Sequence, residues 1–183
     1  MGDVNFGDIG QVGAIVTGHA ASVFLNTSQA TVQDDSATRI FISYRRADSA
    51  GYAERLKDWL GRHLGLENIF VDVESIRGGE LLEKKIVSFL RKADLCLALI
   101  GPDWLDETSG EPTPWVEKEL QLASSNMIPI LPVLVNNADI QILDGPTKDR
   151  LSSRLAVRLD ANSWSKSCEN LLDAIRAALG RGD

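Results

Sequence analysis

The segment DLCLALIG, residues 94–101, decides the fold class of this chain of 183 residues. Its six central side chains are all apolar, with no alternation between apolar and polar positions. Successive side chains of a strand point to opposite faces of a sheet, so this run is typical of a strand that is covered on both faces. The segment therefore indicates an α/β fold in which helices cover both faces of a mostly parallel sheet.

Segments predicted as strands alternate with segments predicted as helices along the rest of the chain. Apolar and β-branched runs predict further strands at residues 39–44, 68–73, 128–135 and 155–160. Apolar side chains at helical spacing predict helices at residues 50–65, 81–93, from 115 onward, and 168–180. Parallel sheets of this kind bind ligands outside the carboxyl ends of their strands, so we expect functional residues in the loops that follow the strands.

The composition excludes several classes of function. The formal net charge is −7, and a general nucleic-acid or anionic-membrane binder needs a basic surface, so we expect neither. No apolar run approaches the length of about 18 residues that predicts a membrane span, and no signal peptide is visible. The cysteines, Cys96 and Cys168, and the histidines, His19 and His63, lack metal-ligand spacing. The sequence thus predicts a cytoplasmic protein with reduced thiols and no metal site.

Residues 1–38 are predicted to form a separate N-terminal segment. They contain no Lys or Arg, and glycines fall at positions 7, 10, 13 and 18 between β-forming residues. This pattern indicates short strands separated by glycine turns. The segment is either an assembly motif of strands stacked between identical chains, or a leader that packs on the following domain or stays disordered.

The stretch EPTPWVEKEL, residues 111–120, predicts the start of a helix that carries an unusual pair. Trp115 and Glu119 are four residues apart, so they share one helix face. Such a pair is either a packing contact beside a solvated acid, or a carboxylate held in the lower dielectric beside an indole. In the second case the carboxylate is suited to stabilising a developing positive charge.

Five segments together resemble the bacterial type of the Toll/interleukin-1 receptor (TIR) domain. They are FISYRRADS, IFVDVESIRGGE, IGPDWL, WVEKEL and IPILPVLV, in this order and at the expected spacing. The resemblance covers about residues 39–180 and implies a flavodoxin-like fold with a five-stranded sheet. It also implies that the loop after the second strand, the BB loop of the family, mediates self-association. The residues of this loop are Glu74, Ser75, Ile76, Arg77, Gly78 and Gly79.

The resemblance also implies an enzymatic activity. Many TIR domains of this type cleave NAD⁺ at the nicotinamide–ribose bond, and WVEKE matches the family's catalytic pattern, with Glu119 as the catalytic residue. Nicotinamide leaves from a cationic pyridinium and needs no proton, so a single carboxylate near the ribose can suffice. The remaining product is either linear or cyclic ADP-ribose. NAD⁺ is the substrate, and no further cofactor is expected.

Further substrate contacts are implied near the ends of the first two strands. Arg45 and Arg46 suit the pyrophosphate of NAD⁺, or else they anchor the loop through ion pairs. Relatives often carry an aromatic side chain where this chain has Leu81. Either the chain binds NAD⁺ more weakly than they do, or another ring, Tyr44 or Trp104, stacks on the nucleotide; for Trp104 the alternative is packing beneath the loop. The substrate-binding residues implied by the resemblance are Trp115, Tyr44, Arg45, Arg46, Asp72, Ser75 and Leu81.

Two functions follow from the resemblance. The first is an NAD⁺ glycohydrolase that is activated by self-assembly and acts in bacterial antiphage or cell-death signalling. The second is a scaffold without enzymatic activity that binds other TIR domains through the BB loop. The intact WVEKE pattern favours the enzyme.

Overall fold

The computed structural model describes residues 38–71, 79–104, 114–143, 145–151 and 155–181. The chain divides into two units, residues 1–34 and 35–183, and the described residues belong to the second unit. The N-terminal segment expected at residues 1–38 lies outside the described residues except for Thr38. Within the described ranges, no helix has the length and apolar character needed to cross a bilayer.

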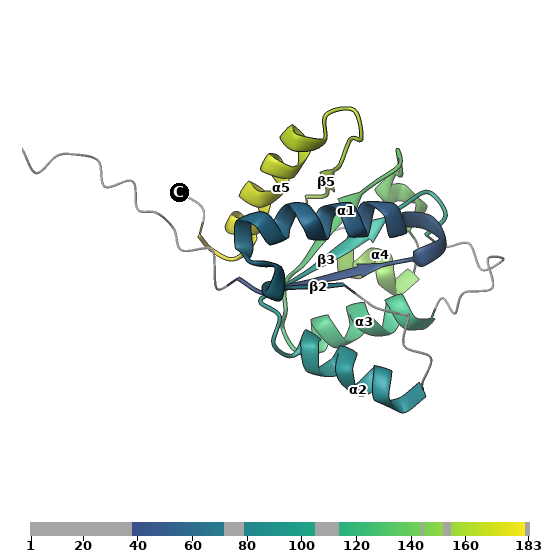
Figure 1. Cartoon of the computed structure of the whole chain (residues 1–183). Coiled ribbons are helices and arrows are strands. Elements are labelled where there is room, and N and C mark those ends of the chain that lie inside the picture. The colour runs from purple at the N-terminus through teal and green to yellow at the C-terminus, as the bar shows by residue number, and fades with distance from the viewer. Residues whose placement is uncertain (1–37, 72–78, 105–113, 144, 152–154, 182–183) are drawn as a thin grey trace, which may run out of the picture. The chain divides into compact units, whose positions relative to one another are not determined.

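A five-stranded parallel sheet forms the centre of the fold, in the order β2-β1-β3-β4-β5 (Figure 1). The strands are β1 Ile40–Tyr44, β2 Ile69–Val71, β3 Leu95–Ile100, β4 Ile130–Leu134 and β5 Val157–Arg158. All five predicted strands are present, and every pairing is parallel. The edge strand β5 is shorter than the predicted segment at residues 155–160. The last two residues of the segment predicted at 68–73 lie outside the described residues.

Helices cover both faces of this sheet. They are α1 Arg46–Leu64, α2 Gly79–Leu90, α3 Pro114–Ser125, α4 Gly145–Leu151 and α5 Trp164–Ala178, with short 3-10 helices η2 Leu66–Asn68 and η4 Ile140–Ile142. In Figure 1, α1 and α5 lie above the sheet, whereas α2 and α3 lie below it. The predicted fold class, an α/β flavodoxin-like sheet between two helical layers, is confirmed.

The helices differ from the sequence-based prediction at several boundaries and by one helix that was not predicted. Helix α1 begins at Arg46 and not at residue 50, because a short first turn precedes a kink at Ser49, where φ is −136° and ψ is 15°. Helix α5 begins at Trp164, four residues before the predicted start. Helix α4 was not predicted, since its seven residues are too few to show a helical period.

Two hydrophobic cores, one on each face, follow from the alternation of side chains along the strands. Ile40, Ile42 and Tyr44 of β1 pack in the core that α1 and α5 cover. Phe41 packs in the core on the other face, together with residues of α2, α3 and α4. Strand β3 contributes to both cores, and all six of its residues are 0% exposed. A strand covered on both faces is what the apolar segment at residues 94–101 predicts.

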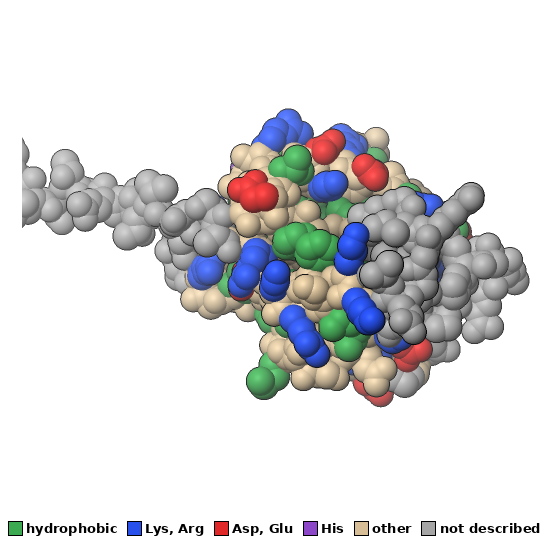
Figure 2. Space-filling model, turned by 60° about the horizontal axis from the view of Figure 1, so that its bottom comes forward, with side chains coloured by type: hydrophobic (Ala, Val, Ile, Leu, Met, Phe, Trp, Pro, Cys, Tyr) green, Lys and Arg blue, Asp and Glu red, His purple; other side chains and the backbone are tan. Residues whose placement is uncertain are grey.

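Lys and Arg side chains lie around apolar ones among the described residues on the side of the molecule where α2 and α3 lie (Figure 2). Lys84, Lys85 and Arg91 are exposed. Phe89 of α2 is 39% exposed and stacks on Phe70 of β2, with the ring centroids 4.6 Å apart.

Arg39 and Asp94 hold the amino-terminal ends of β1 and β3 together. The carboxylate of Asp94 accepts hydrogen bonds from the backbone N–H of Arg39 at 2.9 Å and from its guanidinium at 3.1 and 3.2 Å. Partial burial acts to raise the pKa of Asp94, but the hydrogen bonds from Arg39 outweigh it and lower this pKa below its usual value. A lowered pKa means that the folded state stabilises the ionised carboxylate.

Replacing this carboxylate, in Asp94→Asn, is expected to lower the free energy of unfolding at neutral pH. The contribution of Asp94 is present above its unfolded-state pKa of about 4 and is lost as the pH falls through its lower folded-state pKa. The difference between variant and wild type should therefore shrink in acid, as measured by urea unfolding across this pH range. Asp173→Asn, which removes an exposed ion pair with Arg176, serves as the control. A difference that persists undiminished in acid would contradict the assignment.

Candidate functional site

The candidate site lies at the carboxyl ends of β1 and β3, where the parallel sheet meets the first turns of α3. Helix α3 packs on β1, β3 and β4, and its second turn carries Glu119 toward the sheet. Loops at this edge are the usual ligand-binding position of an open parallel sheet.

Glu119 is a buried carboxylate that is hydrogen-bonded to β1. Glu119 is 1% exposed and Ser43 is 0% exposed, so both residues are enclosed by the fold. The hydroxyl of Ser43 donates a hydrogen bond of 2.6 Å to Oε2 of Glu119. This short distance is typical of a hydroxyl that donates to an ionised carboxylate. The contact joins the second turn of α3 to the centre of the sheet.

Small side chains on the sheet surround this carboxylate. Ser43 lies beside Ala98 of β3 in the parallel register, and Cys96 occupies the same face of β3 two residues earlier. Burial raises the pKa of the Cys96 thiol far above its usual range, and the negative charge of Glu119 raises it further. The carboxylate therefore acts on its surroundings through a medium of low dielectric, where its electrostatic effect on a nearby cation is strong.

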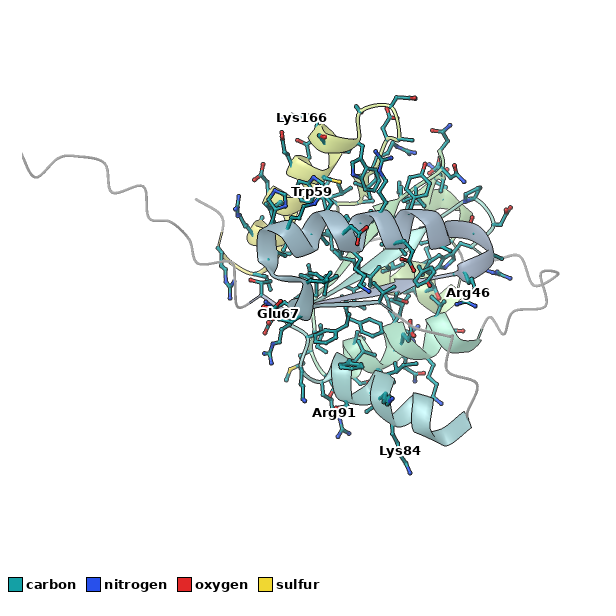
Figure 3. All side chains as sticks on the ribbon, in the orientation of Figure 1. Arg46, Trp59, Glu67, Lys84, Arg91 and Lys166 are labelled. Atoms are coloured by element: carbon teal, nitrogen blue, oxygen red, sulfur yellow. The ribbon has the colours of Figure 1, made fainter. Side chains whose placement is uncertain are left out.

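The two arginines that follow β1 have different environments. Arg45 is 4% exposed, and its Nη1 donates to the carbonyl oxygens of Asp103 at 3.1 Å and Trp104 at 2.9 Å. Arg46 begins α1 and is exposed (Figure 3). Arg45 thus holds the loop that follows β3, whereas Arg46 extends its charge into solvent at the same edge of the sheet.

Asp48 ties the start of α1 to the same loop. Its Oδ1 accepts a hydrogen bond from the backbone N–H of Asp103 at 3.3 Å. An added Cβ at Gly101 would lie 2.2 Å from both carboxylate oxygens, so a larger residue at this position would displace the Asp48 carboxylate. Burial raises the pKa of Asp48, while hydrogen bonds from the backbone of Asp103 and Gly101 act against the rise. The loop that follows β3 is therefore held by two side chains of opposite charge: Arg45 donates to its carbonyl oxygens, and Asp48 accepts from its backbone N–H.

The two rings proposed to stack on a nucleotide, Tyr44 and Trp104, are both buried and present no exposed ring face beside Glu119. Tyr44 is 8% exposed and packs in the core under α1 and α5, on the face of the sheet opposite Glu119. Trp104 is 4% exposed and packs in the core on the Glu119 face. In this conformation both rings are packing residues.

The remaining residues of the predicted site are placed only in part. Gly79 is the first residue of α2, Leu81 lies in that helix, and Trp115 is the second residue of α3. The predicted substrate contacts and loop residues that lie outside the described residues are Asp72, Glu74, Ser75, Ile76, Arg77 and Gly78.

Ser43 is a site residue that the sequence analysis missed. The signal was available in FISY, where one serine interrupts an apolar strand that is predicted to be covered. A hydroxyl buried in such a strand needs a hydrogen-bond partner. The sequence does not say which helix supplies that partner.

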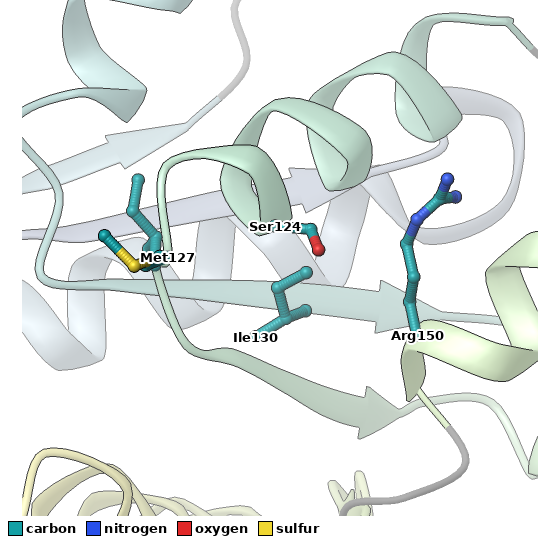
Figure 4. A pocket seen from close by; sticks show the side chains of 5 residues that line it. Ser124, Met127, Ile130 and Arg150 are labelled. Atoms are coloured by element: carbon teal, nitrogen blue, oxygen red, sulfur yellow. The ribbon is translucent and has the colours of Figure 1, made fainter.

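A cavity of about 300 Å³ lies between the last turn of α3, β4 and α4 (Figure 4). It is lined by Ser124, Met127, Ile128, Ile130 and Arg150. Arg150 forms an ion pair with Glu117 at 3.7 Å. Across the described residues, no cluster of three or more His, Cys, Asp or Glu side chains could hold a metal ion.

Comparison with known proteins agrees with the fold. The TIR domain family model matches residues 40–172. The NAD(+) hydrolase SARM1 of Danio rerio is 36% identical over 101 residues, which are 53% of this chain and 14% of that protein. The chain thus spans about one seventh of that relative's length.

A solved structure is similar over most of the chain. The TIR domains of the activated Roq1 resistosome directly recognizing the pathogen effector XopQ match with a TM-score of 0.55 and 13% identity, over 75% of this chain and 99% of that chain. At this identity the similarity concerns the fold alone. Because the family match runs from β1 past β5 and covers most of the chain, the protein belongs to the TIR domain family.

Proposed function

We propose that this TIR domain is an NAD⁺ glycohydrolase in which Glu119 is the catalytic carboxylate. The observation that carries the proposal is the buried Glu119 carboxylate, fixed by Ser43 at the carboxyl edge of the sheet. The relative named as an NAD(+) hydrolase, which shares 36% identity over 101 residues, supports the same substrate. The expected setting is self-assembling antiphage or cell-death signalling in a bacterial cytoplasm.

The proposed reaction needs one anion and no acid for the leaving group. The bond between ribose C1′ and the nicotinamide nitrogen breaks, and its electron pair neutralises the pyridinium as nicotinamide leaves. Positive charge develops on the ribose ring, and water then adds to C1′ and loses a proton to give ADP-ribose. A preorganised carboxylate stabilises this developing charge more strongly when it is held in a low-dielectric site.

The closed state of the site supports control by self-association. At 1% exposure, Glu119 does not meet substrate in the described conformation. Contact with a ribose therefore requires a rearrangement at this edge of the sheet. Binding between copies of the domain would supply the free energy for such a change, if the open form assembles better than the closed form.

The variant Glu119→Gln is expected to lower kcat by roughly 10²–10³-fold, because it removes the charge while it keeps the side-chain volume. Gln can still accept the hydrogen bond from Ser43, so the melting temperature should change little. NAD⁺ consumption with product chromatography measures the effect. Glu117→Gln in the same helix, which removes only the half-exposed partner of Arg150, is the control. Full activity in Glu119→Gln would eliminate Glu119 as the catalytic residue.

The two arginines after β1 are expected to give different phenotypes. Arg45→Ala leaves two loop carbonyls without their donor and should lower the free energy of unfolding by about 1.5–3 kcal/mol. Arg46→Ala should change it by less than about 0.5 kcal/mol. We propose that Arg46 contacts the pyrophosphate, so this variant should raise KM and leave kcat unchanged. Urea unfolding and steady-state kinetics separate the two effects, and an unchanged KM in Arg46→Ala would refute its role.

Turnover per molecule is expected to rise steeply with protein concentration, because the active form is an assembly. NAD⁺ consumption over a concentration series, with light scattering on the same samples, measures this. A truncated chain that begins at Ser36 should show less turnover if residues 1–35 drive assembly. Assembly without NAD⁺ loss at any concentration would instead favour the scaffold function, in which the domain only binds other TIR domains.

A further inference from the structure

Ser43 is a polar residue in a strand whose other members are apolar or aromatic. All five residues of β1 are buried, and a buried hydroxyl is costly unless it is hydrogen-bonded. Valine or alanine would fill the same strand position without that requirement, and β-branched residues suit strands better. Packing therefore does not account for a serine here, and its bond to Glu119 does.

The bond fixes a flexible side chain to a rigid part of the fold. Glu119 extends from α3 through three rotatable bonds, and holding such a side chain in one rotamer costs conformational entropy. Ser43 has a short side chain on β1, which is paired on both sides, with β2 and with β3. The position of its hydroxyl is therefore set by the sheet. The carboxylate is held against this fixed donor at 2.6 Å.

We propose that Ser43 is a positioning residue that holds the Glu119 carboxylate in its reactive orientation. This inference rests on the proposed NAD⁺ glycohydrolase function. Ser43 does not need to touch the substrate, because it acts through Glu119. The hydroxyl of Ser43 donates its single proton in a hydrogen bond to Oε2 of Glu119. Such a donor favours the ionised carboxylate, which stabilises a developing positive charge. Loss of the donor leaves the carboxylate present but poorly placed.

The test compares three substitutions at Ser43 in the full-length chain. Ser43→Ala removes the donor and should lower kcat by about 10- to 100-fold, the range expected for a misplacement of about 1 Å, with KM little changed. Ser43→Cys fills the position but replaces the hydroxyl with a weak donor, so it should resemble Ser43→Ala. Ser43→Thr keeps the hydroxyl and should retain most of the activity. The melting temperature of each variant corrects the rates for any unfolded fraction.

Ser167→Ala is the matched control. Ser167 is 7% exposed, and its hydroxyl accepts a hydrogen bond of 3.2 Å from the backbone N–H of Asp160 in the part of the fold that carries α5. This variant also removes a buried, hydrogen-bonded serine hydroxyl, but one that has no contact with Glu119. It should lower the melting temperature and leave kcat unchanged. A second comparison places Ser43→Ala in the Glu119→Gln background, where it should cause no further loss of activity.

The possible outcomes separate this inference from the proposed function. Wild-type protein that cleaves no NAD⁺ at any concentration would overturn both. Active wild type with an unchanged kcat in Ser43→Ala would overturn the positioning role alone and leave Glu119 as the catalytic residue. Equal loss in folded Ser43→Thr and Ser43→Ala would also overturn it, because the hydroxyl would then not matter. A fall in kcat that Ser43→Thr restores, without a shift in KM, would establish the role.

Discussion

Burial of both faces of β1 and β3 is the constraint on which the rest of this structure depends. Because side chains alternate along a strand, each residue is committed to one of two cores. Phe41 and Ser43 face α3, whereas Ile42 and Tyr44 face α1 and α5. A slip of one residue would place a tyrosine ring where the serine hydroxyl meets Glu119, and it would bury that hydroxyl in the wrong core.

Two charged side chains, Arg45 and Glu119, are buried at one edge of the sheet and have different hydrogen-bond partners. Arg45 and Glu119 are 4% and 1% exposed, and burial of either charge is costly without polar partners. Arg45 is satisfied by two loop carbonyls, and its charge is used for structure. Glu119 accepts a hydrogen bond from the hydroxyl of Ser43, a neutral donor that orients the carboxylate.

The strands were predictable from the sequence because each one is a short apolar run with clear ends. The apolar segment at residues 94–101 predicted a strand covered on both faces, and β3 has this burial. Helix α4 was not predictable, since seven residues that begin with Gly145 carry no periodic signal. The start of α1 was missed for a related reason: the apolar period begins after the kink at Ser49, so the first turn has no pattern of its own.

The sequence proposes a catalytic carboxylate but does not predict its hydrogen-bond partner. Glu119 was proposed because WVEKE resembles the catalytic pattern of the family, and the partner, Ser43, lies 76 residues earlier in the chain. Spacing within one helix cannot reveal a partner that only the register of the sheet brings close. The same limit applies to Arg45 and Arg46, which are adjacent in sequence and equal in charge. Their environments differ because the loop carbonyls that bind Arg45 come from the segment after β3.

The Cys96 thiol, which lies near the Glu119 carboxylate, is shielded from oxidants and alkylating reagents. Cys96 is 0% exposed, and both its burial and its charged neighbour keep it protonated. A protonated, enclosed thiol is a poor nucleophile, so oxidants and alkylating reagents do not reach or modify it in the closed state. Separation of α3 from the sheet would expose the sulfur, and it would also break the hydrogen bond between Ser43 and Glu119. Alkylation of Cys96 therefore reports on the loss of the positioned carboxylate, and not on a rearrangement that admits substrate while α3 stays on the sheet.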